Sequence, residues 1–184
     1  MNAITINDPS VGLKKYILKG SIATNAFLKH MKNKGANFTK FATVVKDLSK
    51  SPGYSYKKYL TNQDKGWVYI VSVDNKVVKI GQTDATLSSR FSSYQAGTRK
   101  NREKGTCSVT NWYCSEVWRE ALNKGLPVEI YVYPVPTTIT QVPVFGDTIS
   151  VRNKHAYVFE HALLNEYQNL SGGYPILSNN NSET

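Results

Sequence analysis

Long apolar runs are missing from this sequence of 184 residues, and it carries only two cysteines. Because no apolar run approaches the length that crosses a bilayer, the sequence predicts neither a membrane-spanning helix nor a membrane partner. The opening residues, MNAITINDPS, lack the basic and apolar regions of a signal peptide, so we expect a cytoplasmic protein. With 40% apolar and 11% aromatic residues, the composition is sufficient for one globular domain with an extension.

The two cysteines, Cys107 and Cys114, have no CxxC partner and no matching histidine pair. Ordinary reduced thiols are therefore favoured over a metal knuckle. A structural disulfide is not expected in a reducing compartment.

Acidic residues are nearly absent from the first 60 positions. This stretch has eleven lysines, no arginine and two carboxylates, Asp8 and Asp47, so it carries 11 − 2 = +9 of the total net charge of +10. Such a segment attracts a polyanion, and nucleic acid is favoured over a membrane because no lipid-inserting stretch accompanies the charge. A solvated lysine surface that aids solubility is the alternative interpretation.

Helical spacing of apolar residues occurs twice in this basic stretch. Residues 22–31 show it first, and after Gly35 it recurs at Phe38, Phe41, Val45 and Leu48. The sequence therefore predicts two short helices joined by a glycine turn, followed by a basic, aromatic linker at 50–60. We expect residues 1–60 to form a basic helical extension that serves DNA binding or dimerisation.

The segment WVYIVSVDNKVVKIGQT, residues 67–83, alternates loosely between apolar and polar residues around Asp74-Asn75. That dipeptide tolerates the left-handed backbone of a tight turn, so the pattern predicts a β-hairpin. Lys79 is unexpected in the second strand, where a purely structural hairpin has no need of a cation. Beyond the hairpin, Thr83 or Asp84 is the expected cap of a helix.

That helix is predicted to place Leu87, Phe91 and Tyr94 on one face together with Arg90. Residues 97–125 have no clear periodicity, and the segments 127–136 and 137–145 are β-rich but broken by prolines, so at least one is expected to be an edge strand. Residues 155–170 then predict a helix with the apolar stripe Ala156, Phe159, Leu163, Tyr167 and Leu170.

Glu160 lies on this apolar stripe. A buried carboxylate costs several kcal/mol unless it is paired or holds a metal. One explanation is a helix rotated so that Glu160 reaches solvent or an arginine. The other is a metal ligand, because one carboxylate together with waters and phosphate oxygens suits Mg²⁺.

Five polar positions in a fixed order resemble the GIY-YIG nuclease superfamily: Tyr69 in VYI, Lys79 in KIG, Arg90, Tyr94 and the helical Glu160. In that family a small antiparallel sheet presents a tyrosine from each of the first two motifs. The next helix contributes an arginine, and a later helix contributes a metal-binding glutamate. Here Trp67 replaces the glycine of the first motif and Lys79 replaces the second tyrosine. This lysine form is most similar to the sequence-specific restriction endonucleases of the family.

The resemblance, which spans about residues 66–180, implies an α+β fold with a small antiparallel three-stranded sheet flanked by helices. The nuclease core would be residues 61–184, with an inserted recognition segment at about 97–125. It also implies a type II restriction endonuclease that binds double-stranded DNA, acts as a homodimer on a roughly palindromic site, and uses one Mg²⁺ per active site, for which Mn²⁺ can substitute. Expected DNA-binding residues are Lys29, Lys32, Lys34, Gln82, Arg99, Lys100 and Arg102. Candidates for the dimer contact are Tyr54, Tyr56, Tyr59, Trp112 and Trp118, and the alternative is that all five are core or DNA-facing residues.

Phosphodiester hydrolysis needs an activated water, stabilisation of phosphoryl charge and help for the leaving oxygen. Tyr69 is the expected general base, although a phenol rarely ionises at neutral pH, and Lys79 on the neighbouring strand is the cation expected to favour its phenolate. Arg90 is expected to clamp the phosphate, Tyr94 to donate to it, and Glu160 to hold the metal. The alternatives are a homing or repair-type nuclease of the same family, and a basic DNA-binding protein without catalysis.

Cooperation between Tyr69 and Lys79 requires that both point to the same face of the sheet. A strict two-residue turn at Asp74-Asn75 would put them on opposite faces. The sequence therefore predicts a three-residue turn or a bulge that places Lys79 opposite Val71.

Overall fold

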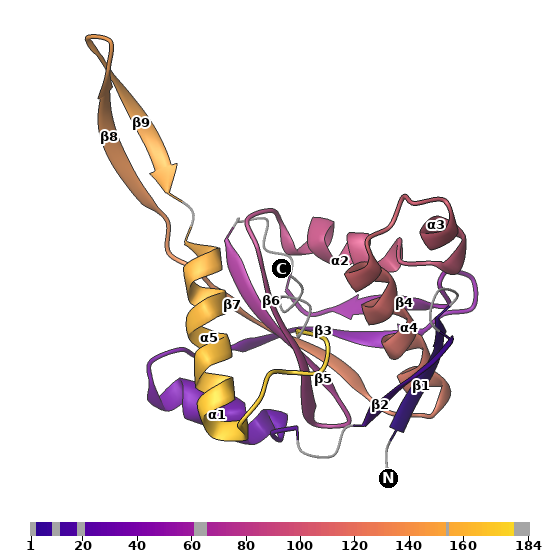
Figure 1. The fold of residues 1–184 in the computed structure, drawn as a ribbon. Helices are drawn as coiled ribbons and strands as arrows, with labels where there is room; N and C mark the ends of the chain where they lie inside the picture. Colours follow the sequence, from indigo (N-terminus) through magenta and orange to yellow (C-terminus); the bar gives the residue numbers. More distant parts are fainter. Residues whose placement is uncertain (1–2, 9–11, 18–20, 61–65, 154, 179–184) are drawn as a thin grey trace.

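The computed structural model describes residues 3–8, 12–17, 21–60, 66–153 and 155–178, the first two ranges as backbone only. The chain has an α+β fold (Figure 1). Its described helices are α1 (Thr24–Asn33), α2 (Leu87–Gln95), α3 (Arg99–Glu103), α4 (Val109–Asn123) and α5 (Ala156–Ser171). Among the described residues, none of these helices is both long and apolar enough to cross a membrane.

The central sheet has five antiparallel strands in the order β4-β3-β7-β5-β6, rather than the three expected from the sequence. Its members are β3 (Thr39–Lys46), β4 (Tyr54–Lys58), β5 (Trp67–Val73), β6 (Lys76–Thr83) and β7 (Val128–Pro134). The two additional strands come from the lysine-rich region. A separate hairpin of β1 (Ala3–Asp8) and β2 (Gly12–Ile17) lies beside α4.

The prediction of two helices in the basic region is half correct. Residues 22–31 do lead into α1, but the segment after Gly35 is the strand β3. Its β-branched residues favour extended backbone, and Phe41, Ala42 and Val44 are buried between the sheet and its helices. Leu48, which completed the apparent helical period, is exposed in a turn. The region is therefore not a helical extension, because part of it builds the sheet.

Helices cover both faces of the sheet (Figure 1). Side chains of α2 and α4 pack on one face, and side chains of α1 and α5 pack on the other. The second half of the segment 97–125, expected to be a recognition insertion, is α4, whose Trp112, Cys114 and Trp118 lie in the core. In this segment the exposed residues lie on α3, in the turns beside it and at the two ends of α4, because the middle of α4 covers the sheet.

The β5–β6 hairpin confirms the predicted parity. Asp74 and Asn75 form a two-residue turn with φ of 50° and 55°, and the register shifts between Val71 and Ser72. Val71 pairs with Lys79 and Tyr69 with Gly81, so a bulge places Lys79 on the face of Tyr69. The bulge lets a tight turn coexist with the predicted alignment of Tyr69 and Lys79.

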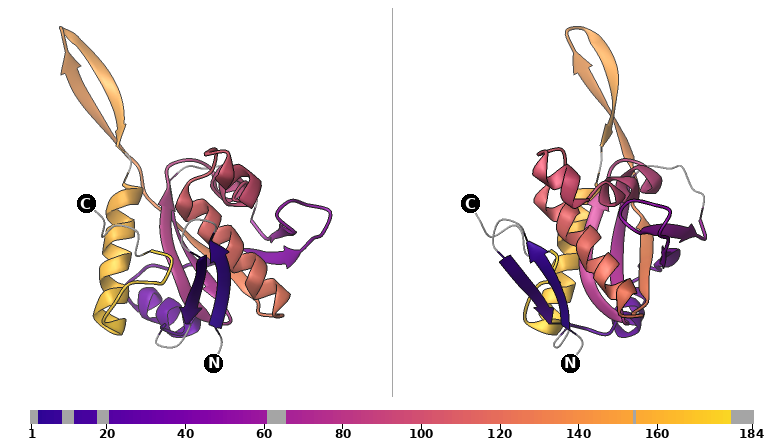
Figure 2. Two further views of the ribbon diagram at one scale, coloured as in Figure 1. Left: turned by 45° about the vertical axis from the view of Figure 1, so that its right-hand side comes forward. Right: turned by 90° about the vertical axis from the view of Figure 1, so that its right-hand side faces the viewer.

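A further hairpin, of β8 (Thr138–Val144) and β9 (Asp147–Asn153), projects away from the body of the molecule (Figures 1 and 2). It pairs only with itself, which confirms that one of the proline-broken segments is an edge strand. Nearly all its side chains are exposed on both faces. We call residues 138–153 the arm.

Helix α5 forms where the sequence predicts it. Ala156, Leu163 and Tyr167 of the expected stripe are buried, whereas Leu170 is exposed because the last turn extends beyond the sheet. Glu160, in the second turn, is partly buried.

Candidate active site

Three of the predicted catalytic side chains meet on the α2 face of the sheet. Tyr69 comes from β5, and Arg90 and Tyr94 lie one turn apart on α2. The hydroxyl oxygens of Tyr69 and Tyr94 are 2.6 Å apart. Arg90 donates from Nε to Tyr69 Oη at 2.9 Å and from Nη2 to Tyr94 Oη at 2.8 Å. The spacing of four residues on a helix, visible in the sequence, produces this fork.

The polar groups of this cluster supply hydrogen-bond donors to the Tyr69 oxygen. Burial lowers the pKa of Arg90, but Tyr69 and Tyr94 outweigh burial and hold that pKa above its ordinary value, so the guanidinium stays charged. Burial raises the pKa of Tyr94 well above its ordinary value, which keeps Tyr94 a neutral donor. When Tyr94 donates to Tyr69, two donors converge on Tyr69 Oη.

Solvent access to the cluster runs through Arg90. Both tyrosine side chains are fully buried, and Arg90 is partly exposed. The Tyr94 hydroxyl faces Tyr69 and Arg90 inside the protein, and its contact with a phosphate stays a prediction. A phosphate that approaches Tyr69 first meets the guanidinium.

Gly81, paired with Tyr69 across the hairpin, makes room for the tyrosine ring. A Cβ at position 81 would lie 2.4 Å from Tyr69 Cζ and 2.4 Å from its Oη. The glycine of the KIG motif is thus required by close approach of a ring. This role was not predicted from the sequence, although a glycine inside a β-branched strand is a known signal of such approach.

Two further tyrosines, on β4, hold α2 in place. Tyr54 Oη donates to Tyr94 O at 3.3 Å, and Tyr56 Oη donates to Phe91 O at 3.1 Å. Both rings pack edge-on against Trp118. The sequence predicted a linker here, yet the spacing of two residues between the tyrosines was the available signal for one face of a strand.

Lys79 lies on the predicted face but contacts the chain's C-terminal segment. It is 7% exposed, and its Nζ donates to Leu177 O at 2.9 Å. Residues 177 and 178 cover the outer edge of β6: Leu177 N donates to Val78 O, and Ile80 N donates to Ser178 Oγ. The cation in contact with Tyr69 Oη is Arg90, where the sequence predicts Lys79. The C-terminal cover was not predicted from the sequence.

Glu160 lies on α5, which packs along the edge strand β6 on the face of the sheet opposite α2. Burial raises the pKa of its carboxyl, while the charges of Lys79, His161 and Arg90 oppose that rise. Within the described residues it forms no ion pair, so the rotated-helix explanation through an arginine contact is not what the structure shows. A partly buried carboxylate beside two cations is suited to binding a metal together with phosphate oxygens.

The donor set fits Mg²⁺ held mostly by substrate and water. Among the described residues no three His, Cys, Asp or Glu side chains gather into a cage. Cys107 and Cys114 are both free thiols and both buried, as the sequence favours. One carboxylate with open coordination positions is the usual arrangement where Mg²⁺ bridges a protein and a phosphate.

The predicted DNA-binding residues fall into three groups. Arg99, Lys100 and Arg102 lie on or beside the exposed side of α3, although Arg99 pairs with Glu103 at 2.9 Å. Lys29 and Lys32 are exposed on α1, which adjoins the turn end of the β5–β6 hairpin, through the bridge of Ala23 with Lys76. Lys34 and Gln82 form the third group.

Lys34 is bound to Glu166 at 2.6 Å, an interaction that offsets its charge. Gln82 follows Gly81 on β6, and its Oε1 is buried with no hydrogen-bond partner in the described part of the chain. Gln82 pairs with Val68, so its side chain lies on the face of the sheet opposite Tyr69; a buried acceptor without a donor is costly, and a ligand that donates to it would relieve that cost.

The aromatic residues proposed for a dimer contact are mostly core. Tyr54, Trp112 and Trp118 are buried among β4, α2 and α4, and Tyr56 is partly buried. Only Tyr59 is exposed, so this group is wrong as a dimer surface. Their packing against the sheet explains why a short chain carries so many large rings in this region.

No protein-family model and no curated protein matches the chain. Solved structures are similar to it, and two nucleases are among them. Restriction endonuclease HPY188I in complex with product DNA is 23% identical, with a TM-score of 0.56 over 91% of this chain and 90% of that chain. EndoII of bacteriophage T4, solved as a mutant, is 17% identical, with a TM-score of 0.51 over 77% of this chain and 94% of that chain. The chain therefore has a fold found in nucleases.

Proposed function

We propose that this protein is a DNA endonuclease of the GIY-YIG type, and specifically a Mg²⁺-dependent type II restriction endonuclease that cuts a short, roughly palindromic duplex sequence as a homodimer. The observation that carries the proposal is the cluster in which Arg90 donates to both Tyr69 and Tyr94, with Glu160 contributed by α5. The fold shared with two nucleases, one of them solved with product DNA, supports it.

Tyr69 is the general base in this proposal, and Arg90 is the group that makes it one. A guanidinium that donates to Tyr69 Oη stabilises negative charge on that oxygen and so favours removal of a proton from water. Tyr94, a neutral hydroxyl, supplies the second donor. This assigns to Arg90 and Tyr94 the activating role that the sequence suggested for Lys79.

The scissile phosphate would bind the Arg90 guanidinium while Arg90 keeps its contact with Tyr69. A guanidinium has five N–H donors, and Nε and Nη2 donate to the two phenols, so the other donors are available to a phosphate. Lys79 lies near Glu160, where its charge offsets that of the carboxylate and the phosphate.

Glu160 would hold the Mg²⁺ ion. When bound, the ion supplies charge stabilisation at the phosphoryl and leaving oxygens. Because Glu160 comes from α5 and Arg90 from α2, the two side chains would approach a phosphate from different sides. Such an arrangement suits an in-line displacement, in which the attacking water and the leaving oxygen lie on opposite sides of the phosphorus.

Two alternatives remain as outcomes of a test. A homing or repair-type nuclease would share the chemistry but not the palindromic double-strand cut, and a basic DNA-binding protein would not cut at all. Within the described residues the basic groups of α1 and α3 serve any of these three functions, so they do not discriminate.

The test is incubation of the purified protein with plasmid DNA and Mg²⁺, with an EDTA arm and a Mn²⁺ arm, followed by sequencing of the DNA ends. Discrete bands with one common end sequence are expected, and EDTA should abolish them. A smear indicates a nonspecific nuclease, nicks alone favour the homing or repair type, and intact plasmid with retained DNA binding contradicts the enzyme proposal.

DNA binding by the basic helices is tested separately through its salt dependence. Replacing Lys29 and Lys32 with alanine, or Arg102 and Lys100 with alanine, is expected to reduce the slope of log affinity against log salt. The expected reduction is about one unit for each phosphate that the variant no longer neutralises. An unchanged slope in the variant without Lys29 and Lys32 would indicate that these lysines serve solubility rather than DNA binding. The matched control is Lys124→Ala, at the end of α4.

A further inference from the structure

The tip of the arm carries an aromatic residue that is unfavourable where it stands. Phe145 is fully exposed, and its backbone has φ of 51°, a left-handed conformation that bulky side chains rarely adopt. Its neighbour Gly146, with φ of 94°, adopts such a conformation at no steric cost. A turn that needs only polar, permissive residues therefore presents a large apolar ring to water, which indicates a contact for that ring.

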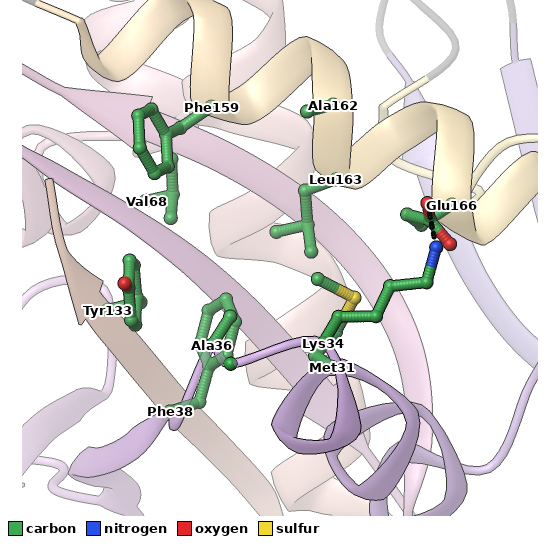
Figure 3. A pocket seen from close by; sticks show the side chains of 11 residues that line it. Met31, Lys34, Ala36, Phe38, Val68, Tyr133, Phe159, Ala162, Leu163 and Glu166 are labelled. Atoms are coloured by element: carbon green, nitrogen blue, oxygen red, sulfur yellow. Dashed lines mark hydrogen bonds and ion pairs between the residues drawn. The ribbon is translucent and has the colours of Figure 1, made fainter.

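The same chain has an apolar cavity that is large enough for such a ring. About 270 Å³ of space lies between α1, α5 and the sheet (Figure 3). Met31, Phe38, Phe159 and Leu163 form its walls, and the ion pair of Lys34 with Glu166 lies at its edge (Figure 3). An apolar cavity of about 150 Å³ is already enough to bind benzene, so this one accepts a phenylalanine ring. Phe159 and Tyr133, whose rings stack on one another, also line it.

We propose that Phe145 of one copy of this chain inserts into the α1–α5 cavity of a second copy, and that two copies exchange arms in this way. This inference rests on the proposed function, because a double-strand break requires a second copy of the chain and the exchange of arms supplies that copy. Exchange of identical contacts is the closed two-fold arrangement that most homodimers adopt.

The arm has the apolar surface that such an exchange buries. The pairs Val142 with Ile149 and Thr140 with Val151 lie on one face of the hairpin, and all three apolar members are exposed. An isolated two-stranded hairpin is marginally stable in water, so a partner for this face stabilises the arm itself. Two arms that lie side by side bury the same face of each.

Charge favours a second copy over DNA as the occupant. Each chain carries a net charge of +10, so two copies repel one another over most of their surfaces. The arm holds one acidic and one basic residue, Asp147 and Arg152, and is therefore neutral. A neutral apolar arm is poorly suited to a polyanion, but it is the surface through which two basic proteins approach at least cost.

The arm is long enough to reach the α1–α5 cavity of a second copy. Strands of seven residues extend about 24 Å at about 3.4 Å per residue. The arm joins the chain at the first turn of α5, and Phe159 and Leu163 in the cavity wall follow within about two turns. When two arms run in opposite directions, the tip of each lies beside the base of the other, next to that cavity.

The test is sedimentation velocity of the full chain without DNA over a range of concentrations. Phe145→Ser removes the ring, and Ala162→Trp fills the mouth of the cavity from an exposed position on α5. Each is expected to weaken dimerisation by about a hundredfold, since each removes both symmetry-related ring contacts. Matched controls are Ile139→Ser, an exposed residue on the other face of the arm, and Asn165→Trp, an exposed α5 residue outside the cavity lining. Both controls should sediment as the wild type, and all four should melt as it does.

A mixture of the Phe145→Ser and Ala162→Trp variants gives a sharper test than either variant alone. Phe145→Ser retains an intact cavity and Ala162→Trp retains an intact ring, so a mixed dimer has one complete contact, whereas each variant alone has none. The mixture should associate more strongly than either variant. A wild type that is monomeric at every concentration overturns the inference, as do two variants that sediment as wild type. A Phe145→Ser effect seen only on duplex binding also overturns it and assigns the tip to DNA. Because no cleavage is measured, failure of the nuclease proposal and failure of this one are distinguishable.

Discussion

The two long hairpins of this protein have the same local design and opposite surroundings. The β5–β6 hairpin turns at Asp74-Asn75 and the arm turns at Phe145-Gly146, in each case through two residues of positive φ. Every residue of β5 is buried, whereas almost every residue of β8 is exposed. Short-range sequence is therefore sufficient to make a hairpin, and the rest of the chain decides whether it becomes a core or an arm.

The buried hairpin also carries the chemistry. Tyr69 and Lys79 lie on one face of it, and Gly81 gives space to the tyrosine ring. The arm presents only apolar and neutral polar groups with one pair of opposite charges. The comparison predicts that small changes in the first hairpin alter catalysis and stability, and that equal changes in the arm leave the stability of the monomer unchanged.

The largest expected effect is on cleavage. Tyr69→Phe removes one oxygen from the buried hairpin and keeps the ring, so we expect a cleavage rate lower by about a thousandfold with duplex binding retained. Arg90→Ala and Glu160→Gln should do the same. Rates of plasmid cleavage measure it, and Tyr174→Phe, an exposed tyrosine, is the control. If Tyr69→Phe cuts at the wild-type rate, the base is another group.

Next in size is the close approach at Gly81. Gly81→Ala places a Cβ 2.4 Å from the buried Tyr69 ring, so the ring or the strand must move. We expect a loss of about 3 kcal/mol in the free energy of unfolding, together with loss of cleavage. Urea unfolding measures it. Gly173→Ala, with nothing within 4 Å of the added Cβ, should unfold as the wild type, and equal losses in both variants would contradict the assignment.

A smaller effect separates the two hairpins directly. Val71→Thr puts a hydroxyl in the buried strand β5, where we expect a loss of about 2 kcal/mol in the free energy of unfolding. Val142→Thr at the middle of the arm should change it by less than about 0.5 kcal/mol in the monomer. Both are measured by urea unfolding at low protein concentration. Similar values for the two would show that the arm packs against the body.

The smallest expected effect is on pH dependence, which belongs to the surroundings of the buried hairpin. Burial raises the pKa of Glu160, so its carboxyl takes up a proton at a higher pH than an ordinary glutamate. Because a metal needs the carboxylate, Mg²⁺ affinity in the presence of duplex DNA should weaken as pH falls through that raised pKa. Calorimetry over about pH 5 to 8 measures it. Glu160→Gln should bind weakly with a flat profile, and a flat wild-type profile would exclude Glu160 as the ligand.

Much of the candidate site was predictable because its parts are local. The spacing of Arg90 and Tyr94 on a helix, the turn at Asp74-Asn75 and the helical position of Glu160 all follow from patterns within a few residues. The bulge in the β5–β6 hairpin was predicted from one requirement, that Tyr69 and Lys79 point to the same face of the sheet. A periodic pattern of a few residues states which side chains share a face, and this is all that these predictions needed.

The failures share one physical cause. β3 has an apolar spacing that fits a helix, but pairing with β4 and β7 overrides it. Residues 109–123 lack a clear period because α4 is buried on most of its circumference. Neither the pairing nor the burial is encoded in the neighbouring residues.

By itself, the sequence determined the local elements and the order of the polar positions: hairpin, helix with Arg90 and Tyr94, and late helix with Glu160. Only the tertiary structure decided that Arg90 rather than Lys79 contacts Tyr69, that Leu177 holds Lys79, and that one hairpin is buried and the other exposed. The reason is distance along the chain. Each of these outcomes depends on segments 21 to 98 residues apart, or on the covering helices, and is decided by which surfaces are removed from water together.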